Sequence, residues 1–202
     1  MKTNEELLQD VLKHLDSLSP IKPSDIPNID LYMDQVTTFM EHHMENNKRF
    51  PEEKVLTKTM INNYAKNRLL PAPVRKRYSQ EHILMLIFIY YYKNMLNFED
   101  ISQLLEPISD RHFSKDSSFS LESVYNEILT LEQGQRSHLK DDVMEKYVRA
   151  EKSFQDAPES EKDYLQLFGF VSELAFDVYL KKQMIERIID QMKPETPPGK
   201  KK

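Results

Sequence analysis

The sequence predicts a mainly helical, all-α protein with a minimal β wing in its middle. Apolar residues recur at helical spacing in one segment after another along the 202 residues. Two prolines followed by three consecutive cations interrupt this pattern at residues 71–77. An apolar run, residues 83–92, is too short to span a bilayer and is therefore a core element. We expect four parts: residues 1–29, 30–108, 109–193 and 194–202.

Composition narrows the class of protein. The chain is 39% hydrophobic and 30% charged with a net charge of −5, which is typical of a soluble surface around a core. The absence of cysteine excludes disulfides, thiolate metal sites and thiol nucleophiles. The start, MKTNEELLQDVLKHL, lacks the pattern of a secretory signal. We therefore predict a cytoplasmic protein without a membrane span.

The first part, residues 1–29, is a helix followed by a proline-rich linker. Leucines and valine at helical spacing predict a helix from Asn4 to about Leu18, and Pro20, Pro23 and Pro27 end it. The second part, residues 30–108, then begins with Asp30 as the expected N-cap of a helix from Leu31 to about Asn46.

A second helix of this part is expected from about Lys58 to Asn67. The Thr57 hydroxyl can accept a bond from a free backbone N–H at its start. Met60, Ile61 and Tyr64 lie on one side, and the other side carries no acid: Lys58, Thr59, Asn62, Asn63, Lys66 and Asn67. Asparagine can bond base edges and lysine can neutralise phosphate, although a solvated helix face would have a similar composition.

The wing is expected next. Pro71 and Pro73 prevent the helix from continuing, so residues 74–78 should be extended. Ser79 is the expected N-cap of a buried helix that contains the apolar run, in which the tyrosines at 90–92 should pack rather than stack on bases. Asn97 with Asp100 caps a further helix.

Positive charge is concentrated around these elements. Residues 54–93 contain eight lysines and arginines and a single acid, Glu81, a net of +7, so the rest of the chain carries −12. Such a segment is the electrostatic signature of a surface that binds a polyanion, with nucleic acid the first candidate. A solvated face balanced by acidic residues elsewhere would give the same charge.

The third part, residues 109–193, should be helical after a serine-rich loop at 109–120. Apolar stripes occupy residues 121–131 and, beyond Gly134, residues 139–148. A pattern from Ser160 to just before Pro194 predicts a helix of about thirty residues, roughly 45 Å long. The spacing of its apolar residues does not sustain clean heptads, so the pattern does not decide between contact with a second subunit and an intramolecular bundle. The tail, 194–202, is expected to be disordered.

The order of these parts is that of a winged helix-turn-helix. The stretch TKTMINNYAKNRLLPAPVRKRYSQEHILMLIFI resembles the DNA-binding domain of MerR-type transcription factors, and NFEDISQLL is similar to their next helix. IDLYMDQVTTFM, LTKTMINNYAK and YSQEHILMLIFIYYYKN resemble a bacterial family without an established activity, the domain-of-unknown-function 1836 proteins. The MerR resemblance covers about 75 residues, from Leu31 to Leu105, and the resemblance to the 1836 family covers most of the same region.

The MerR resemblance implies which residues would bind duplex DNA. Those in or beside the major groove would be Thr57, Lys58, Asn62, Asn63, Lys66 and Asn67, and those on the flanking phosphates would be Arg75, Lys76, Arg77 and Tyr78. Arg68, which stands where those factors have a turn glycine, is also predicted to bind DNA. Asn62, Asn63 and Tyr64 replace their usual Arg-Tyr-Tyr.

The sequence also bears on functions other than DNA binding. The three glycines form no phosphate-binding loop and His42 and His43 have no suitably spaced partner, so we expect no enzyme, metal or cofactor. An interaction module that docks an acidic protein could use the same cations, and RNA binding is a third alternative. In a DNA-binding regulator the third part would serve dimerisation or regulation, and the sequence neither predicts nor excludes a small-molecule effector.

Overall fold

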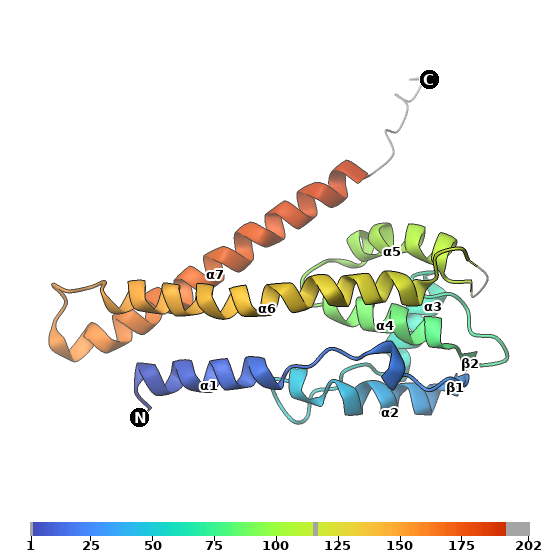
Figure 1. Ribbon diagram of the computed structural model, residues 1–202, viewed down its shortest axis with the longest axis horizontal. Coiled ribbons are helices and arrows are strands. Elements are labelled where there is room, and N and C mark those ends of the chain that lie inside the picture. The colour runs from blue at the N-terminus through green and yellow to red at the C-terminus, as the bar shows by residue number, and fades with distance from the viewer. Residues whose placement is uncertain (1, 115–116, 193–202) are drawn as a thin grey trace, which may run out of the picture. The chain divides into compact units, whose positions relative to one another are not determined.

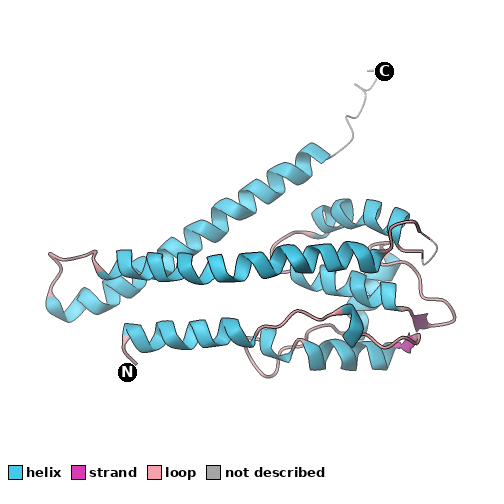
Figure 2. Ribbon diagram, in the orientation of Figure 1, coloured by secondary structure: helices cyan, strands magenta, loops and turns pink. Residues whose placement is uncertain are grey.

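The computed structural model of the protein describes residues 2–114 and 117–192 (Figure 1). It is mainly helical, as predicted, and its strands form one short antiparallel pair (Figure 2). The helices are α1 Asn4–Ser17, α2 Met33–His43, α3 Lys58–Lys66, α4 Gln80–Tyr92, α5 Phe98–His112, α6 Leu121–Glu151 and α7 Glu159–Met192, and the strands are β1 Leu31–Tyr32 and β2 Arg77–Tyr78. The tail predicted to be disordered, 194–202, lies outside the described residues.

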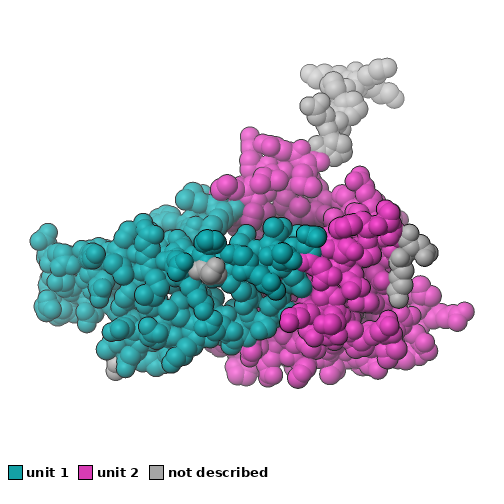
Figure 3. All heavy atoms as spheres, in the orientation of Figure 1, with its two compact units in different colours: residues 1–20, 127–181 teal, residues 21–126, 182–202 magenta. Residues whose placement is uncertain are grey.

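The chain forms two compact units (Figure 3). Unit 1 comprises residues 1–20 and 127–181, and unit 2 comprises residues 21–126 and 182–202. Helices α6 and α7 therefore each contribute to both units. Among the described helices, none combines the length and the apolar character needed to cross a membrane.

Unit 2 is built around α4. Nine consecutive residues of this helix, 82–90, are buried, which confirms the prediction that it is packed on more than one side. Of the three tyrosines predicted to pack, Tyr90 is buried and Tyr92 is partly buried, whereas Tyr91 is 38% exposed. On α6, Tyr125 packs its ring against Phe88 at 5.4 Å between centroids and donates its hydroxyl hydrogen to the carbonyl oxygen of Ile21.

The start of α2 differs from the prediction. Leu31 and Tyr32 form β1 instead of a first helical turn, because they pair with Tyr78 and Arg77 of the wing. The N-cap is Tyr32 rather than Asp30, and the Tyr32 N–H donates to Gln35 Oε1 at 2.9 Å. The helix ends at His43, and a single 3₁₀ turn follows at Glu45–Asn47.

Two further boundaries are corrected. The loop expected from Ser109 starts later, because α5 runs through Pro107 to His112. The stripes on either side of Gly134 belong to one helix, α6, of 31 residues. The predicted long helix is confirmed as α7, with 34 residues.

Unit 1 packs α1 against parts of α6 and α7. The core cluster consists of Leu8, Val143, Ala150 and Phe170. Thr3 and Glu6 form a capping box at the start of α1, in which each side chain accepts a bond from the other's backbone N–H. This unit is separate from the predicted DNA-binding residues, all of which lie in unit 2.

Candidate nucleic-acid interface

Helix α3 has the two faces that the sequence predicts. The hydroxyl of its N-cap, Thr57, accepts a hydrogen bond from the Met60 N–H at 3.2 Å. Ile61 is fully buried, whereas Met60 and Tyr64 are partly buried. The polar side chains expected on the opposite face are all exposed: Lys58, Thr59, Asn62, Asn63, Lys66 and Asn67.

The C-terminal end of α3 places Arg68 in a left-handed conformation, with φ of 61°. Beyond it the backbone N–H groups of Leu69 and Leu70 donate to the carbonyl oxygen of Tyr64 at 2.9 and 3.2 Å. A carbonyl group in the last turn of the helix thereby gains hydrogen-bond donors. Asn67 Nδ2 donates to the Asn63 carbonyl at 2.8 Å. Part of the Asn67 amide is therefore used within its own helix.

The wing, residues 74–78, is only partly extended: Arg77 and Tyr78 form β2 as predicted, whereas Arg75 and Lys76 form a tight turn. Val74 and Arg77 form an isolated antiparallel β-bridge, in which the Arg77 N–H donates to the Val74 carbonyl oxygen at 2.9 Å. The two residues between them, Arg75 and Lys76, have φ of 51° and 63°. Positive φ at both central residues is the signature of a type I′ turn. The turn presents Arg75 and Lys76 to solvent at its tip.

Tyr78 is the exception among the predicted DNA-binding residues. Its side chain is only 3% exposed, and its ring packs edge-on against His82 at 5.5 Å between centroids. Burial also raises the pKa of its hydroxyl. Tyr78 therefore packs in the core of unit 2, and its burial does not favour the phosphate contact that the MerR resemblance implies.

Two of the cations predicted to bind DNA already have partners. Lys58 forms an ion pair with Asp34 at the start of α2. The Arg77 guanidinium lies over the Tyr32 ring, 5.2 Å from its centroid, and donates through Nη2 to the Tyr32 hydroxyl at 3.1 Å. Lys66, Arg68, Arg75 and Lys76 pair with no carboxylate in the described part of the chain.

The residues of this surface lie within a region that matches a known protein family. Residues 21–128 match the family described as Domain of unknown function (DUF1836). The chain belongs to this family. The resemblance to the domain-of-unknown-function 1836 family that the sequence predicted is thereby confirmed. The searches of curated proteins and of solved structures find no match.

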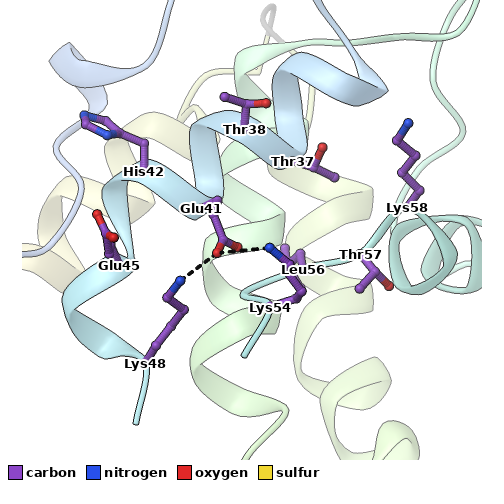
Figure 4. A pocket seen from close by; sticks show the side chains of 10 residues that line it. All are labelled: Thr37, Thr38, Glu41, His42, Glu45, Lys48, Lys54, Leu56, Thr57 and Lys58. Carbon is purple, nitrogen blue, oxygen red and sulfur yellow. Dashed lines mark hydrogen bonds and ion pairs between the residues drawn. The ribbon is translucent and has the colours of Figure 1, made fainter. Parts of the chain in front are cut away.

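The DUF1836 region contains a further feature that the sequence did not reveal, the anchoring of the connection between α2 and α3. This connection runs beside an open hollow of about 530 Å³ at the start of α3 (Figure 4). Glu41 lies in the hollow and accepts from Lys48 Nζ at 2.7 Å and from the Val55 N–H at 3.2 Å. The Lys48 bond holds the pKa of Glu41 below its usual range.

Lys93, the C-cap residue of α4, anchors the same connection. Its ammonium group donates to the Val55 carbonyl oxygen at 2.8 Å and lies 4.9 Å from the centroid of the Tyr90 ring. The side chains of Val55 and Leu56 are buried. The only sequence signal for this anchor is the apolar pair Val55–Leu56 in a polar stretch. Among the residues that the structure describes, no three His, Asp or Glu side chains are grouped to hold a metal.

Proposed function

We propose that this DUF1836 protein is a cytoplasmic, DNA-binding, transcriptional regulator-like protein. In this proposal residues 30–108 form a winged helix-turn-helix of MerR type that contacts duplex DNA. The observation that carries the proposal is the backbone at the basic turns. Three of the four described non-glycine residues with positive φ are the exposed cations Arg68, Arg75 and Lys76.

This backbone conformation is unfavourable for the residues that adopt it. A left-handed conformation costs an L-residue with a side chain roughly 1–2 kcal/mol, and glycine or asparagine would adopt it more readily. Backbone strain of this kind is concentrated at functional sites. Since the three side chains are exposed and pack little, the positive charge itself is the best explanation for arginine and lysine at these turns.

The proposed arrangement places α3 in the major groove. Asn62 and Asn63 would contact base edges, Lys58 and Lys66 would contact phosphates beside the groove, and the wing cations Arg75, Lys76 and Arg77 would contact the flanking phosphates. Residues 44–57, which join α2 to α3, are more numerous than the three or four residues of an ordinary helix-turn-helix turn. The proposal therefore assigns base contacts to α3 alone.

The second candidate is an interaction module that docks an acidic protein through the same cations. It is favoured by the two polar groups already in use on α3, the Lys58 ammonium and the Asn67 amide. A surface that retains cations but has fewer free amides suits a negatively charged partner of any kind. Docking of a protein would depend mainly on the wing cations, whereas base recognition would require Asn62 and Asn63.

Binding to a randomised duplex library tests the proposal. Fluorescence anisotropy at several salt concentrations, with sequencing of the retained fraction, should show salt-dependent binding and an enriched motif. Roughly six phosphate contacts predict a slope of log K against log salt near −5. The triple change of Arg75, Lys76 and Arg77 to alanine should weaken binding without unfolding the chain. Absence of retention even at low salt would favour the protein-docking alternative.

We also propose that the protein forms a homodimer through α7. Tyr164, Phe168, Val171, Ala175 and Val178 are exposed and recur at alternating four- and three-residue steps on one face in unit 1. Such a stripe is complementary to a second copy of itself, and its aromatic residues could each bury on the order of 100 Å² more. An isologous dimer would also present two α3 helices to a palindromic site.

Light scattering tests the dimer. Val171→Glu on the stripe should yield a monomer, because it places two charges in the interface. Leu180 is also exposed, at 59%, but lies outside the stripe, so Leu180→Glu is the matched control and should remain dimeric. A wild-type monomer at all concentrations would contradict the proposal.

A further inference from the structure

A short segment at the start of α2 supplies the partners of two cations in the proposed DNA surface. Tyr32 is the last residue of β1, and Asp34 lies in the first turn of α2. The sheet register places Tyr32 directly opposite Arg77, and Asp34 forms the ion pair with Lys58. One segment therefore contacts the wing on one side and the first residue of α3 on the other.

The contact between Tyr32 and Arg77 orients the guanidinium without neutralising it. The Tyr32 hydroxyl accepts from Arg77 Nε at 3.3 Å and from Nη2 at 3.1 Å, while the ring lies under the cation. The other guanidinium N–H groups stay free for a phosphate, because an arginine has five donors. The side chain is exposed, so its rotamers would otherwise be unrestricted. Holding it in one orientation lowers the entropy lost when it binds an anion.

The contact between Asp34 and Lys58 has the opposite consequence. Both side chains are open to solvent, at 76% and 59% exposed, so the pair contributes little to folding. The Asp34 carboxylate binds the Lys58 ammonium group, which would otherwise contact a phosphate at the start of α3. Its negative charge also repels that phosphate. When DNA binds, the ion pair must therefore break, or Lys58 must contact Asp34 and the phosphate at the same time.

We propose that the Tyr32–Asp34 segment sets the affinity of the DNA surface by two opposed contacts. Tyr32 is a positioning residue that presents Arg77 to phosphate, and Asp34 is a negative regulator that withholds Lys58. This inference rests on the proposed function. It adds two residues, neither of them basic, that the charge pattern of the sequence does not identify.

Salt titrations of duplex binding test both contacts in the full-length protein. The probe is a fluorescent duplex carrying the motif enriched from the library or, if none is enriched, a duplex of random sequence. Asp34→Asn should tighten binding about twofold to fivefold and steepen the salt slope by about 0.9, the contribution of one further phosphate contact. Tyr32→Phe should weaken binding about twofold to fivefold with the salt slope unchanged, because no charge is lost.

Two controls separate these effects from simpler ones. Glu99 is an exposed acid in the first turn of α5, so Glu99→Gln removes one negative charge from an equivalent helical position. Equal gains in Asp34→Asn and Glu99→Gln would show an effect of net charge only and would overturn the inference for Asp34. In an Arg77→Ala background, Tyr32→Phe should cause no further loss, and a persistent loss would overturn the inference for Tyr32.

The outcomes also distinguish this inference from the proposed function. Wild-type binding with no response to either substitution would overturn the inference and leave DNA binding intact. Failure of the wild-type protein to bind any duplex at low salt would overturn both. Circular dichroism of each variant should match the wild type, since both altered side chains are exposed.

Discussion

The backbone N–H of Arg77 donates to the carbonyl oxygen of Val74 across 2.9 Å and closes a two-residue turn. The residues within the turn, Arg75 and Lys76, both have positive φ. Asn-Gly is the pair that a type I′ turn favours most strongly. The wing therefore carries two cations where a sequence selected for stability alone would carry neither.

Replacement of the turn by Asn-Gly should separate stability from binding. The double change Arg75→Asn, Lys76→Gly relieves the unfavourable backbone and should raise the free energy of unfolding by about 0.5–1 kcal/mol. It also removes two phosphate contacts, so the salt slope of duplex binding should fall by about 1.8. Urea denaturation and fluorescence anisotropy measure the two effects.

The matched control for this turn is Arg75→Ala, Lys76→Ala. Alanine removes the same charges but retains the strained conformation, because its Cβ disfavours positive φ. The loss of affinity should equal that of the Asn-Gly variant, without the gain in stability. Unchanged affinity in both variants would exclude the turn from the DNA surface.

Arg68 gives an independent test at the end of α3. Arg68→Gly should raise the free energy of unfolding by about 0.5–1 kcal/mol, because glycine at φ of 61° relieves the left-handed strain. It should also weaken duplex binding through the loss of one cation. Thermal denaturation and binding titration provide the measurements, and Arg68→Ala is the comparison that should lose affinity without gaining stability.

His82 should make folding sensitive to acid. It is 3% exposed, its Nδ1 accepts from the Ser79 N–H at 3.0 Å, and its Nε2 has no hydrogen-bond partner in the described residues. Burial lowers the pKa of His82 below its ordinary value of about 6.5, so the neutral ring is favoured in the folded state. The free energy of unfolding should therefore fall as the pH drops below about 6.5.

His82→Gln tests this pH dependence. Glutamine can reproduce the reciprocal cap with Ser79 but cannot be protonated in this range. Urea denaturation between pH 7.5 and pH 5 should show a smaller loss of stability in the variant than in the wild type. His138 is exposed in α6, so His138→Gln should retain the wild-type dependence. Identical pH profiles for the wild type and His82→Gln would contradict the assignment.

The anchor of the α2–α3 connection should contribute to stability. Lys93→Met removes the bond to the Val55 carbonyl oxygen and leaves that group without its ammonium partner, which should cost about 1–3 kcal/mol. Hydrogen exchange should increase in residues 44–57. Lys152 is exposed in unit 1, and Lys152→Met should change neither quantity. Equal stabilities for the two variants would show that Lys93 is not an anchor.

The candidate site was predictable where it depends on neighbours in the sequence. The N-caps Thr57, Ser79 and Asn97, the two faces of α3 and the buried α4 were all expected and are confirmed. The caps are hydrogen bonds between residues three positions apart, and the faces of α3 and the burial of α4 follow from the pattern of apolar residues, so the sequence displays both directly. The exposure of Arg75, Lys76 and Arg77 follows from charge in the same way.

The sequence by itself thus determined the helical class, most helix boundaries and the location of the basic segment. The tertiary structure alone decided that Leu31 and Tyr32 form a strand, that Tyr78 is buried and that Tyr32 holds Arg77. It also decided which apolar residues of α7 remain exposed. The physical reason is that Tyr32 and Arg77 are 45 positions apart, so their contact depends on chain folding, which local spacing and capping patterns do not record.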